Sequence, residues 1–312
     1  MFGKRVIRTY RPANRLRQGY GGQEAGRYAW PGGRYAWSAG RCLLVLMLAA
    51  MAVPSAQEPA TVTSAVTALD QMLDLYVRDG FVYYRALKID RGKLDRHISQ
   101  LAAVDVGRLS RDGQLAFWLN AYNALVLRTV IDHYPIQGRA PAYPPRSVRQ
   151  VPGAFDAMPH RLAGRSLTLD DIEQKILPEF HDPRVYLALG RGAVGSGRLR
   201  SEAFLPGRLE TQLSEVAAEC ASRPVCVQID RVNNKVLASP IFSWREKEFS
   251  AAYGSAASAV FASRSPIERA VLSFVEPKIL PAERLFLAQN TFQVAYEPFD
   301  WSLNDLTGRG GR

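Results

Sequence analysis

The segment whose residues most resemble a chemical motif is a glycine-rich loop, Gly190-Arg-Gly-Ala-Val-Gly-Ser-Gly-Arg198. Its first six residues have the form G-x-G-x-x-G, which binds a dinucleotide pyrophosphate when it joins a strand to a helix. A short apolar strand is predicted over 184–189, but no helix is predicted to begin at Gly195, so a nucleotide site is not favoured. No Gly-Lys-Ser/Thr follows, which excludes a P-loop. The loop is better interpreted as a tight turn that brings backbone close to another part of the molecule.

Four side chains in and next to this loop are candidates for binding or catalysis. Arg191, Arg198 and Arg200 suit an anionic group, because a guanidinium donates paired hydrogen bonds to a carboxylate or phosphate. The alternative is that all three are solvated. Ser196 stands between two glycines, but the residue two before it is valine, so the nucleophile elbow G-x-S-x-G is absent. If Ser196 is nonetheless a nucleophile, its candidate base is His160, which must then lie within hydrogen-bond reach.

Two asparagines lie three residues apart on the most apolar helix that the sequence predicts, over 110–134. Asn120 and Asn123 share a face of that helix. A buried amide without a partner costs about 1–3 kcal/mol. We therefore expect both side chains to hold the backbone of a loop that crosses the helix. The alternative is that they bind a ligand.

The acidic residues and histidines do not have the spacing of a metal site. Asp170, Asp171 and Glu173 fall in the first turn of a predicted helix after Thr168, where carboxylates interact favourably with the helix dipole. The four histidines show neither H-x-x-x-H nor HExxH spacing. We predict no metal and no cofactor.

Two cysteines remain in the chain after residue 56, and they lie six residues apart. Cys220 is predicted at the end of a helix and Cys226 at the start of a strand. In an oxidising compartment they can form a disulfide that closes a short loop, worth about 2 kcal/mol. Two free thiols are the alternative.

Six motifs occur in an order that carries a family resemblance. The set resembles the domain of unknown function 547 (DUF547) family over about 110–304. That family has no settled activity, and one relationship that the resemblance leaves open is to papain-like folds. The motifs are Phe117-Trp-Leu-Asn-Ala-Tyr-Asn-Ala-Leu125, Ser166-Leu-Thr-Leu-Asp-Asp-Ile-Glu173, Asp182-Pro-Arg-Val-Tyr-Leu-Ala-Leu189, Leu199-Arg-Ser-Glu-Ala-Phe204, Ser239-Pro-Ile-Phe-Ser-Trp244 and Asp300-Trp-Ser-Leu-Asn304.

This chain departs from the family pattern at the positions that matter most for chemistry. Typical members read Asn-Cys-Gly-Ala-x-Ser-Cys-Pro-Pro where this chain has its glycine-rich loop, so Arg191 and Ser196 stand in place of the two cysteines. The histidine that often follows Ile-Glu is Gln174 here, and the histidine that often opens the short strand is Tyr186. A reactive thiolate needs a basic partner. The resemblance therefore implies that this member does no thiol chemistry.

The elements that position these residues indicate an α+β fold. Helices come first, strands are interspersed later, and no regular βαβ repeat is present. We expect N-terminal helices packed with a small mixed or antiparallel sheet. The predicted helices are 62–78, 90–104, 110–134, 169–177, 206–221, 266–276 and 282–288. The predicted strands are 81–84, 160–165, 184–189, 225–229, 235–238 and 291–296, with Asn233-Asn234 as a hairpin turn.

The charge of the 312-residue chain is concentrated at its start. The composition, 47% hydrophobic and 22% charged, is that of a globular protein. Residues 1–56 hold nine of the Lys and Arg against one Glu, although the net charge of the whole chain is +11. The apolar run 42–53 has the length of a signal-peptide core, too short for a bilayer span of about 20 residues. We therefore expect a basic head with a signal peptide over 1–56, followed by one domain over 57–312, with no transmembrane anchor after cleavage and no nucleic acid as partner.

Three functions remain open on the sequence alone. The first is an exported, periplasmic or extracellular domain that binds an unknown small molecule or envelope component without catalysis. The second is a hydrolase or transferase that uses Ser196, and the third is a structural interaction module with an exposed apolar patch. The first requires the loop 190–200 to lie against Asn120 and Asn123 and to form the wall of a pocket.

Overall fold

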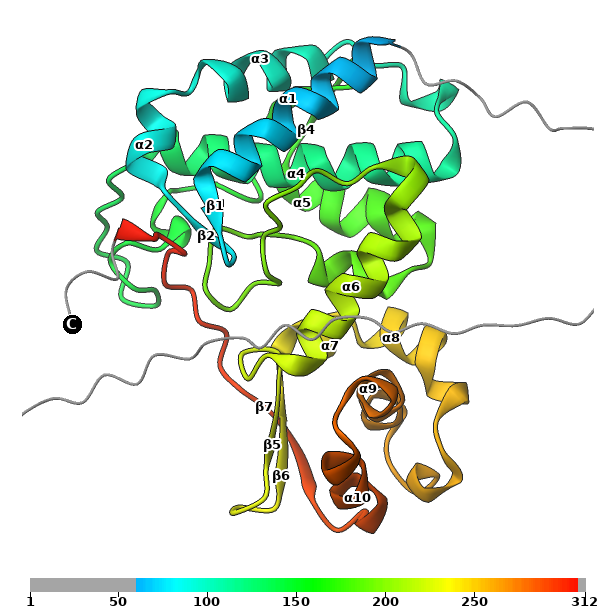
Figure 1. Ribbon diagram of the computed structural model, residues 1–312. Helices are drawn as coiled ribbons and strands as arrows, with labels where there is room; N and C mark the ends of the chain where they lie inside the picture. The colour runs from blue at the N-terminus through cyan, green and yellow to red at the C-terminus, as the bar shows by residue number, and fades with distance from the viewer. Residues whose placement is uncertain (1–59, 308–312) are drawn as a thin grey trace, which may run out of the picture. The chain divides into compact units, whose positions relative to one another are not determined.

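The computed structural model describes residues 60–307 (Figure 1). The predicted basic head and signal peptide, including the run 42–53, lie outside the described residues. The described part combines helices with small sheets, so the predicted α+β class is confirmed.

A group of helices packs around one buried helix near the start of the described chain (Figure 1). The buried helix is α4, and 17 of its 23 residues are buried, because its apolar residues surround the axis on nearly all sides. Ser110 caps it by accepting a hydrogen bond from the Gly113 backbone N–H at 3.0 Å. The group is α1 (Ala60–Tyr76), α2 (Tyr84–Ile89), α3 (Gly92–Leu101) and α4 (Arg111–His133), with the two-stranded hairpin β1 (Val77–Arg78) and β2 (Phe81–Val82) after α1. The predicted central helix is confirmed, whereas α2 was not predicted.

Between α4 and the glycine-rich loop the chain makes a hairpin and then tight helical turns. The hairpin is β3 (His160–Leu162) and β4 (Arg165–Leu167), followed by α5 (Leu169–Asp171) and a wider π-helical turn over Ile172–Ile176. A Thr168–Asp171 capping box starts α5, as the sequence indicates. The predicted helix over 169–177 is therefore a single α-helical turn that continues as a π turn.

The predicted strand over 184–189 is wrong. Residues Pro183–Leu187 form a 3₁₀ helix. Asp182 caps it by accepting the Arg184 backbone N–H at 3.0 Å, and the proline that follows the cap has a backbone angle suited to a helix start. The glycine-rich loop consequently does not follow a strand, which removes the context that a dinucleotide motif needs.

A three-stranded mixed sheet and five α-helices complete the described part of the fold. Strand β6 is central, antiparallel to β5 and parallel to β7. Asn234 in the β5–β6 turn has φ +53°, a conformation that asparagine tolerates, and the predicted hairpin is confirmed. The elements are α6 (Leu209–Ser222), β5 (Val227–Asp230), β6 (Lys235–Ala238), α7 (Pro240–Trp244), α8 (Glu246–Tyr253), α9 (Pro266–Val275), α10 (Pro281–Gln289) and β7 (Gln293–Tyr296). Helices α7 and α8 were not predicted.

The segment after β7 returns to the N-terminal helices, where its red end lies beside β1 and β2 in Figure 1. It runs over the glycine-rich loop, because the Gly195 backbone N–H donates to the Asp300 carbonyl at 2.8 Å. It then reaches β2, where the Val82 backbone N–H donates to the Asn304 carbonyl at 2.9 Å. The loop is thus enclosed on two sides. At Gly197 a Cβ atom would lie 1.6 Å from the Leu187 carbonyl oxygen, so only glycine fits there.

Candidate functional site

Both asparagines of α4 hold loop backbone. The Asn120 amide donates to the Phe204 carbonyl and accepts the Phe204 N–H, each at 2.9 Å. The Asn123 amide donates to the Ala188 carbonyl at 3.2 Å and accepts the Gly190 N–H at 2.8 Å. The glycine-rich loop therefore lies against the asparagine face of α4, as expected. Because backbone groups occupy both amides, we remove Asn120 and Asn123 from the ligand-binding candidates.

A cavity of about 230 Å³ lies next to this loop. Its charged and polar lining consists of Arg149, Asp170, Glu173, Gln174, Arg191 and Arg245. Its aromatic lining consists of Phe155, Trp244 and Trp301. The glycine-rich loop contributes Arg191 to the cavity lining. The other lining residues come from four segments: the one after α4, the turns around α5, the end of α7 and the segment after β7. The sequence predicts a pocket wall made by loop 190–200 near Asn120 and Asn123; of these residues only Arg191 lines this cavity, and most of the cavity wall was not predicted.

The floor of the cavity is a buried cluster of ion pairs around Glu173. Arg191 donates to both carboxylate oxygens, with Nη2–Oε1 at 2.7 Å and Nε–Oε2 at 3.2 Å. Arg245 Nη2 shares Oε1 at 2.9 Å, and the Tyr122 hydroxyl donates to Oε2 at 3.0 Å. Burial by itself would raise the pKa of the Glu173 carboxyl, but the two guanidiniums outweigh burial and hold that pKa at about 2. One ionised carboxylate is therefore shared by two arginines.

Arg149 is the cavity arginine without a carboxylate partner among residues 60–307. Its guanidinium carbon lies 4.4 Å from the ring centroid of Phe155 and 4.4 Å from that of Trp301. The Nε atom is buried and has no hydrogen-bond partner. Cation–π contacts orient the guanidinium but do not satisfy its N–H groups. The Arg149 guanidinium is therefore held in place and still has an N–H group available to a ligand.

Asp170 is the second carboxylate of the cavity lining. No hydrogen bond or ion pair to its side chain occurs within the described part of the chain. Burial raises the pKa of the Asp170 carboxyl, and the nearby Glu173 charge raises it further, whereas Arg149 opposes both effects. The cavity therefore offers an unbonded carboxyl group near an unpaired guanidinium.

Two of the predicted anion-binding arginines lie elsewhere. Arg198 pairs with Asp79 at 3.1 Å and with Glu219 at 2.8 Å. Arg200 pairs with Glu202 and Glu215, each at 2.5 Å. Both line a separate hollow whose wall also contains Glu202 and Glu219. Their charges are already balanced by carboxylates, so we correct the expectation that they join Arg191 around an anion.

The structure does not join the predicted catalytic pair. Ser196 is 5% exposed, and its Oγ accepts the Arg191 backbone N–H at 3.0 Å, which stabilises the loop. His160 is half-buried in β3, where burial lowers its pKa and Arg128 of α4 lowers it further. No hydrogen bond between Ser196 and His160 is present among the described residues, and neither of them lines the cavity.

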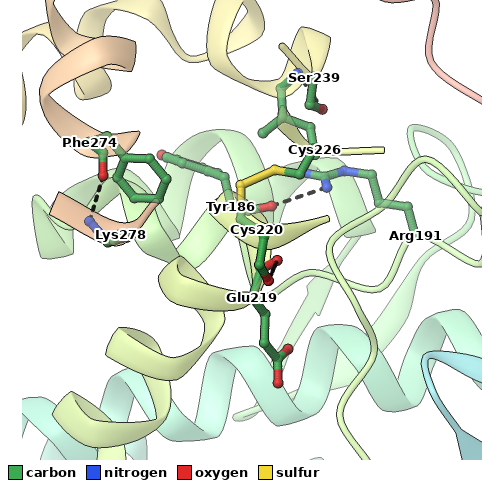
Figure 2. The surroundings of a disulfide bond; sticks show 10 residues. Tyr186, Arg191, Glu219, Cys220, Cys226, Ser239, Phe274 and Lys278 are labelled. Atoms are coloured by element: carbon green, nitrogen blue, oxygen red, sulfur yellow. Dashed lines mark hydrogen bonds between the residues drawn. A yellow bond between two sulfur atoms is a disulfide. The ribbon is translucent and has the colours of Figure 1, made fainter. Parts of the chain in front are cut away.

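The two cysteines that follow residue 56 are bonded to each other (Figure 2). The Cys220–Cys226 disulfide connects the end of α6 to the start of β5, with 5.2 Å between the two Cα atoms. Figure 2 also shows Arg191 in the surroundings of this bond, where it donates to the Tyr186 carbonyl at 3.2 Å. The disulfide therefore lies in the same region of the fold as the buried ion pairs.

Comparison with known proteins assigns the central part of the chain to a family. Residues 106–219 match the model of the family described as Protein of unknown function, DUF547. This match supports the resemblance to the DUF547 family over the central part of the chain. No curated protein and no solved structure gave a significant match. The matched range supplies Arg149, Phe155 and the lining residues up to Arg191, whereas Trp244, Arg245 and Trp301 come from the part of the chain beyond it.

Two of the four positions where this chain departs from the DUF547 pattern line the cavity. Arg191 stands where the family commonly has its first loop cysteine, and Gln174 stands where it commonly has a histidine; both line the cavity. Tyr186, at the other histidine position, has its ring 4.3 Å below the Arg245 guanidinium carbon. A guanidinium therefore takes the place of a thiol at this site.

Five residues of the cavity lining were not predicted from the sequence as site residues. Trp244 and Trp301 lie in two of the motifs that carry the family resemblance. Those motifs could have identified the two tryptophans as candidate site residues. Arg149, Phe155 and Arg245 lie in segments without a recognisable motif, so only the fold identifies them.

Two further searches of the described residues gave negative results. No group of three or more His, Cys, Asp or Glu residues there is placed to hold a metal ion. None of the helices in residues 60–307 combines the length and the apolar character that a bilayer span requires.

Proposed function

We propose that this DUF547 domain is an exported binding domain that holds a small anionic molecule in the cavity without catalysing a reaction. The observation that carries the proposal is Arg149, a guanidinium oriented between two aromatic rings and lacking a carboxylate partner in the described part of the chain. Arginine in this state is suited to a carboxylate or phosphate, because its planar fork donates two parallel hydrogen bonds. The cavity combines three aromatic rings with six charged or polar side chains, and such convergent polar groups can orient a small molecule.

The charge of the cavity lining supports an anion. Three guanidiniums line it against two carboxylates, and one of those carboxylates, Glu173, is shared by Arg191 and Arg245. The lining is therefore left with an excess of positive charge. An anionic ligand would balance that charge in a partly dehydrated setting, where such pairs are stronger than in water.

The composition of the lining also supports binding over catalysis. Among the described residues that line it there is no hydroxyl, thiol, imidazole or amine side chain, and of its two carboxylates Glu173 is already paired with Arg191 and Arg245. Glu173, with a pKa near 2, is a weak base. The hydrolase alternative keeps Ser196 as its nucleophile and has less support, because that hydroxyl accepts a loop N–H away from the lining. The structural-module alternative predicts no concave site at the loop.

Export is the other part of the proposal. The run 42–53 has the length and composition of a signal-peptide core. The Cys220–Cys226 disulfide supports it independently, since such bonds persist in oxidising compartments. The ligand would then be a periplasmic or extracellular small molecule or a fragment of the envelope.

The test is a calorimetric titration with three anions, namely acetate, inorganic phosphate and D-glucuronate. We expect at least one to bind, and Arg149→Gln to weaken it at least tenfold, because a hydrogen bond to a charged group contributes about 1.5–3 kcal/mol. Arg146→Gln is the matched control, since Arg146 is exposed and does not line the cavity. Absence of binding by all three anions, or equal affinities for Arg149→Gln and Arg146→Gln, would overturn the proposal.

A further inference from the structure

We infer that the ligand is an acidic sugar of the hexuronic acid class, whose ring stacks on Trp244 while its carboxylate pairs with Arg149. This inference rests on the proposed function and specifies its ligand. It depends on three features of the same cavity: an exposed indole, two polar side chains without hydrogen bonds, and the net charge of the lining.

The exposed indole belongs to Trp244, at the end of α7. Its exposure is 47%, which is high for tryptophan, and it lines the cavity. Phe299 supports it at a ring-centroid distance of 4.9 Å, and Trp301 lies nearly parallel to it, at 6.3 Å and 19°. A supported indole at the wall of a polar cavity is a stacking platform. The C–H face of a pyranose ring carries partial positive charge and packs well on the negative face of an aromatic ring.

The unbonded polar side chains are Asp170 and Gln174. Neither forms a side-chain hydrogen bond within residues 60–307, although both line the cavity. The Asp170 carboxylate accepts hydrogen bonds, and the Gln174 amide both donates and accepts them. Sugar hydroxyls also donate and accept, so adjacent hydroxyls of one ring match this pair of side chains.

The charge and size of the cavity distinguish an acidic sugar from other small anions. Aliphatic and aromatic acids without hydroxyl substituents have no alcohol group to donate to Asp170, and the adjacent hydroxyls of a sugar ring offer several. A zwitterionic amino acid would add an ammonium group to a lining in which guanidiniums already outnumber carboxylates. At about 230 Å³ the cavity is below the usual range for drug-sized ligands, which favours a single ring.

The experiment compares D-glucuronate with D-glucose and acetate, each titrated by calorimetry into the purified domain. Glucose shares the ring but has no carboxylate, and acetate has the carboxylate without the ring. We expect glucuronate to bind at least tenfold more tightly than either. Trp244→Ala should weaken glucuronate about tenfold, as loss of a stacking surface does, and leave acetate within about twofold. Tyr83→Ala is the control, because Tyr83 is similarly exposed but does not line the cavity.

One further variant, Gln174→Ala, keeps the result decisive. Gln174→Ala removes an exposed side chain without hydrogen bonds, so it tests the hydroxyl contacts even if Trp244→Ala proves unstable; we expect it to weaken glucuronate and not acetate. The sugar inference fails, and the anion site stands, if glucuronate binds no better than acetate. The same holds if Trp244→Ala and Gln174→Ala leave the glucuronate affinity unchanged while Arg149→Gln abolishes glucuronate binding. If none of the anions binds, the proposed function itself fails.

Discussion

Replacing Glu173 by glutamine should destabilise the domain strongly, because it leaves two buried guanidiniums without their shared carboxylate. The side chains of Arg191 and Arg245 are 3% and 7% exposed, so water cannot replace the lost charge. Breaking a buried ion pair by removing one partner costs about 3–5 kcal/mol. For a domain of this size the loss lowers the melting temperature by about 10 °C.

The lowered pKa of Glu173 predicts how the stability of this cluster depends on pH. The pKa falls from 4.5 to about 2 on folding, which corresponds to about 3 kcal/mol for a nearly fully buried group. Because the folded-state pKa is the lower one, this stability is complete above about pH 4.5 and is lost as the pH falls toward 2. The wild-type free energy of unfolding should decrease over that range, and that of Glu173→Gln should change less.

The assay is urea unfolding followed by circular dichroism between pH 2 and pH 7. Glu210→Gln is the matched control, because Glu210 also pairs with an arginine but is 77% exposed, so its loss should cost less than about 1 kcal/mol. Replacing Glu173, Arg191 and Arg245 together by apolar residues should restore part of the stability, since no unpaired charge then remains. If Glu173→Gln unfolds at the same urea concentration as Glu210→Gln, the reasoning about the buried cluster is wrong.

Three further predictions concern other parts of the chain. Burial lowers the pKa of His97 from 6.5 to about 4, so the free energy of unfolding should fall by about 3 kcal/mol between pH 6.5 and pH 4, because only the unfolded chain takes up the proton there. His97→Met should remove this pH dependence in urea titrations. An unchanged dependence of the free energy of unfolding on pH in that variant would contradict the prediction. Replacing Cys220 and Cys226 by alanine should cost about 2 kcal/mol, measured by thermal unfolding, and reductant should reproduce the loss in the wild type but not in the variant. The mature protein, analysed by mass spectrometry, should lack residues 42–53; a secreted form that retains them would contradict signal cleavage.

The elements that the sequence predicts well are those with strong local patterns. Helix α4 is apolar on nearly all sides and has a serine cap, so its position and burial follow from composition. The β5–β6 hairpin follows from two short apolar runs around Asn233-Asn234. The prediction of a strand over 184–189 is wrong because the five apolar residues 185–189 fit a buried strand and a helical turn equally well, and the helix-starting pair Asp182-Pro183 decides between them.

The cavity could be predicted only in part, since its lining comes from five separate segments. Arg191 was recognised from its place in the loop, but its role changes with the fold, because Glu173 lies against it at 2.7 Å. Arg198 and Arg200 have the same type and nearly the same position in the sequence, yet Arg198 pairs with Asp79 and Glu219, and Arg200 pairs with Glu215 as well as with its neighbour Glu202. Charge pairing over such sequence separations depends on tertiary structure, which composition does not encode.

The central claim, that the cavity around Arg149 binds an anionic ligand, is tested most directly by a crystal structure of the domain soaked with D-glucuronate. The account predicts a carboxylate within hydrogen-bond distance of the Arg149 Nη atoms and a ring packed on Trp244. Density for glucuronate only at the Arg198 and Arg200 hollow, or an empty cavity under saturating ligand, would contradict it.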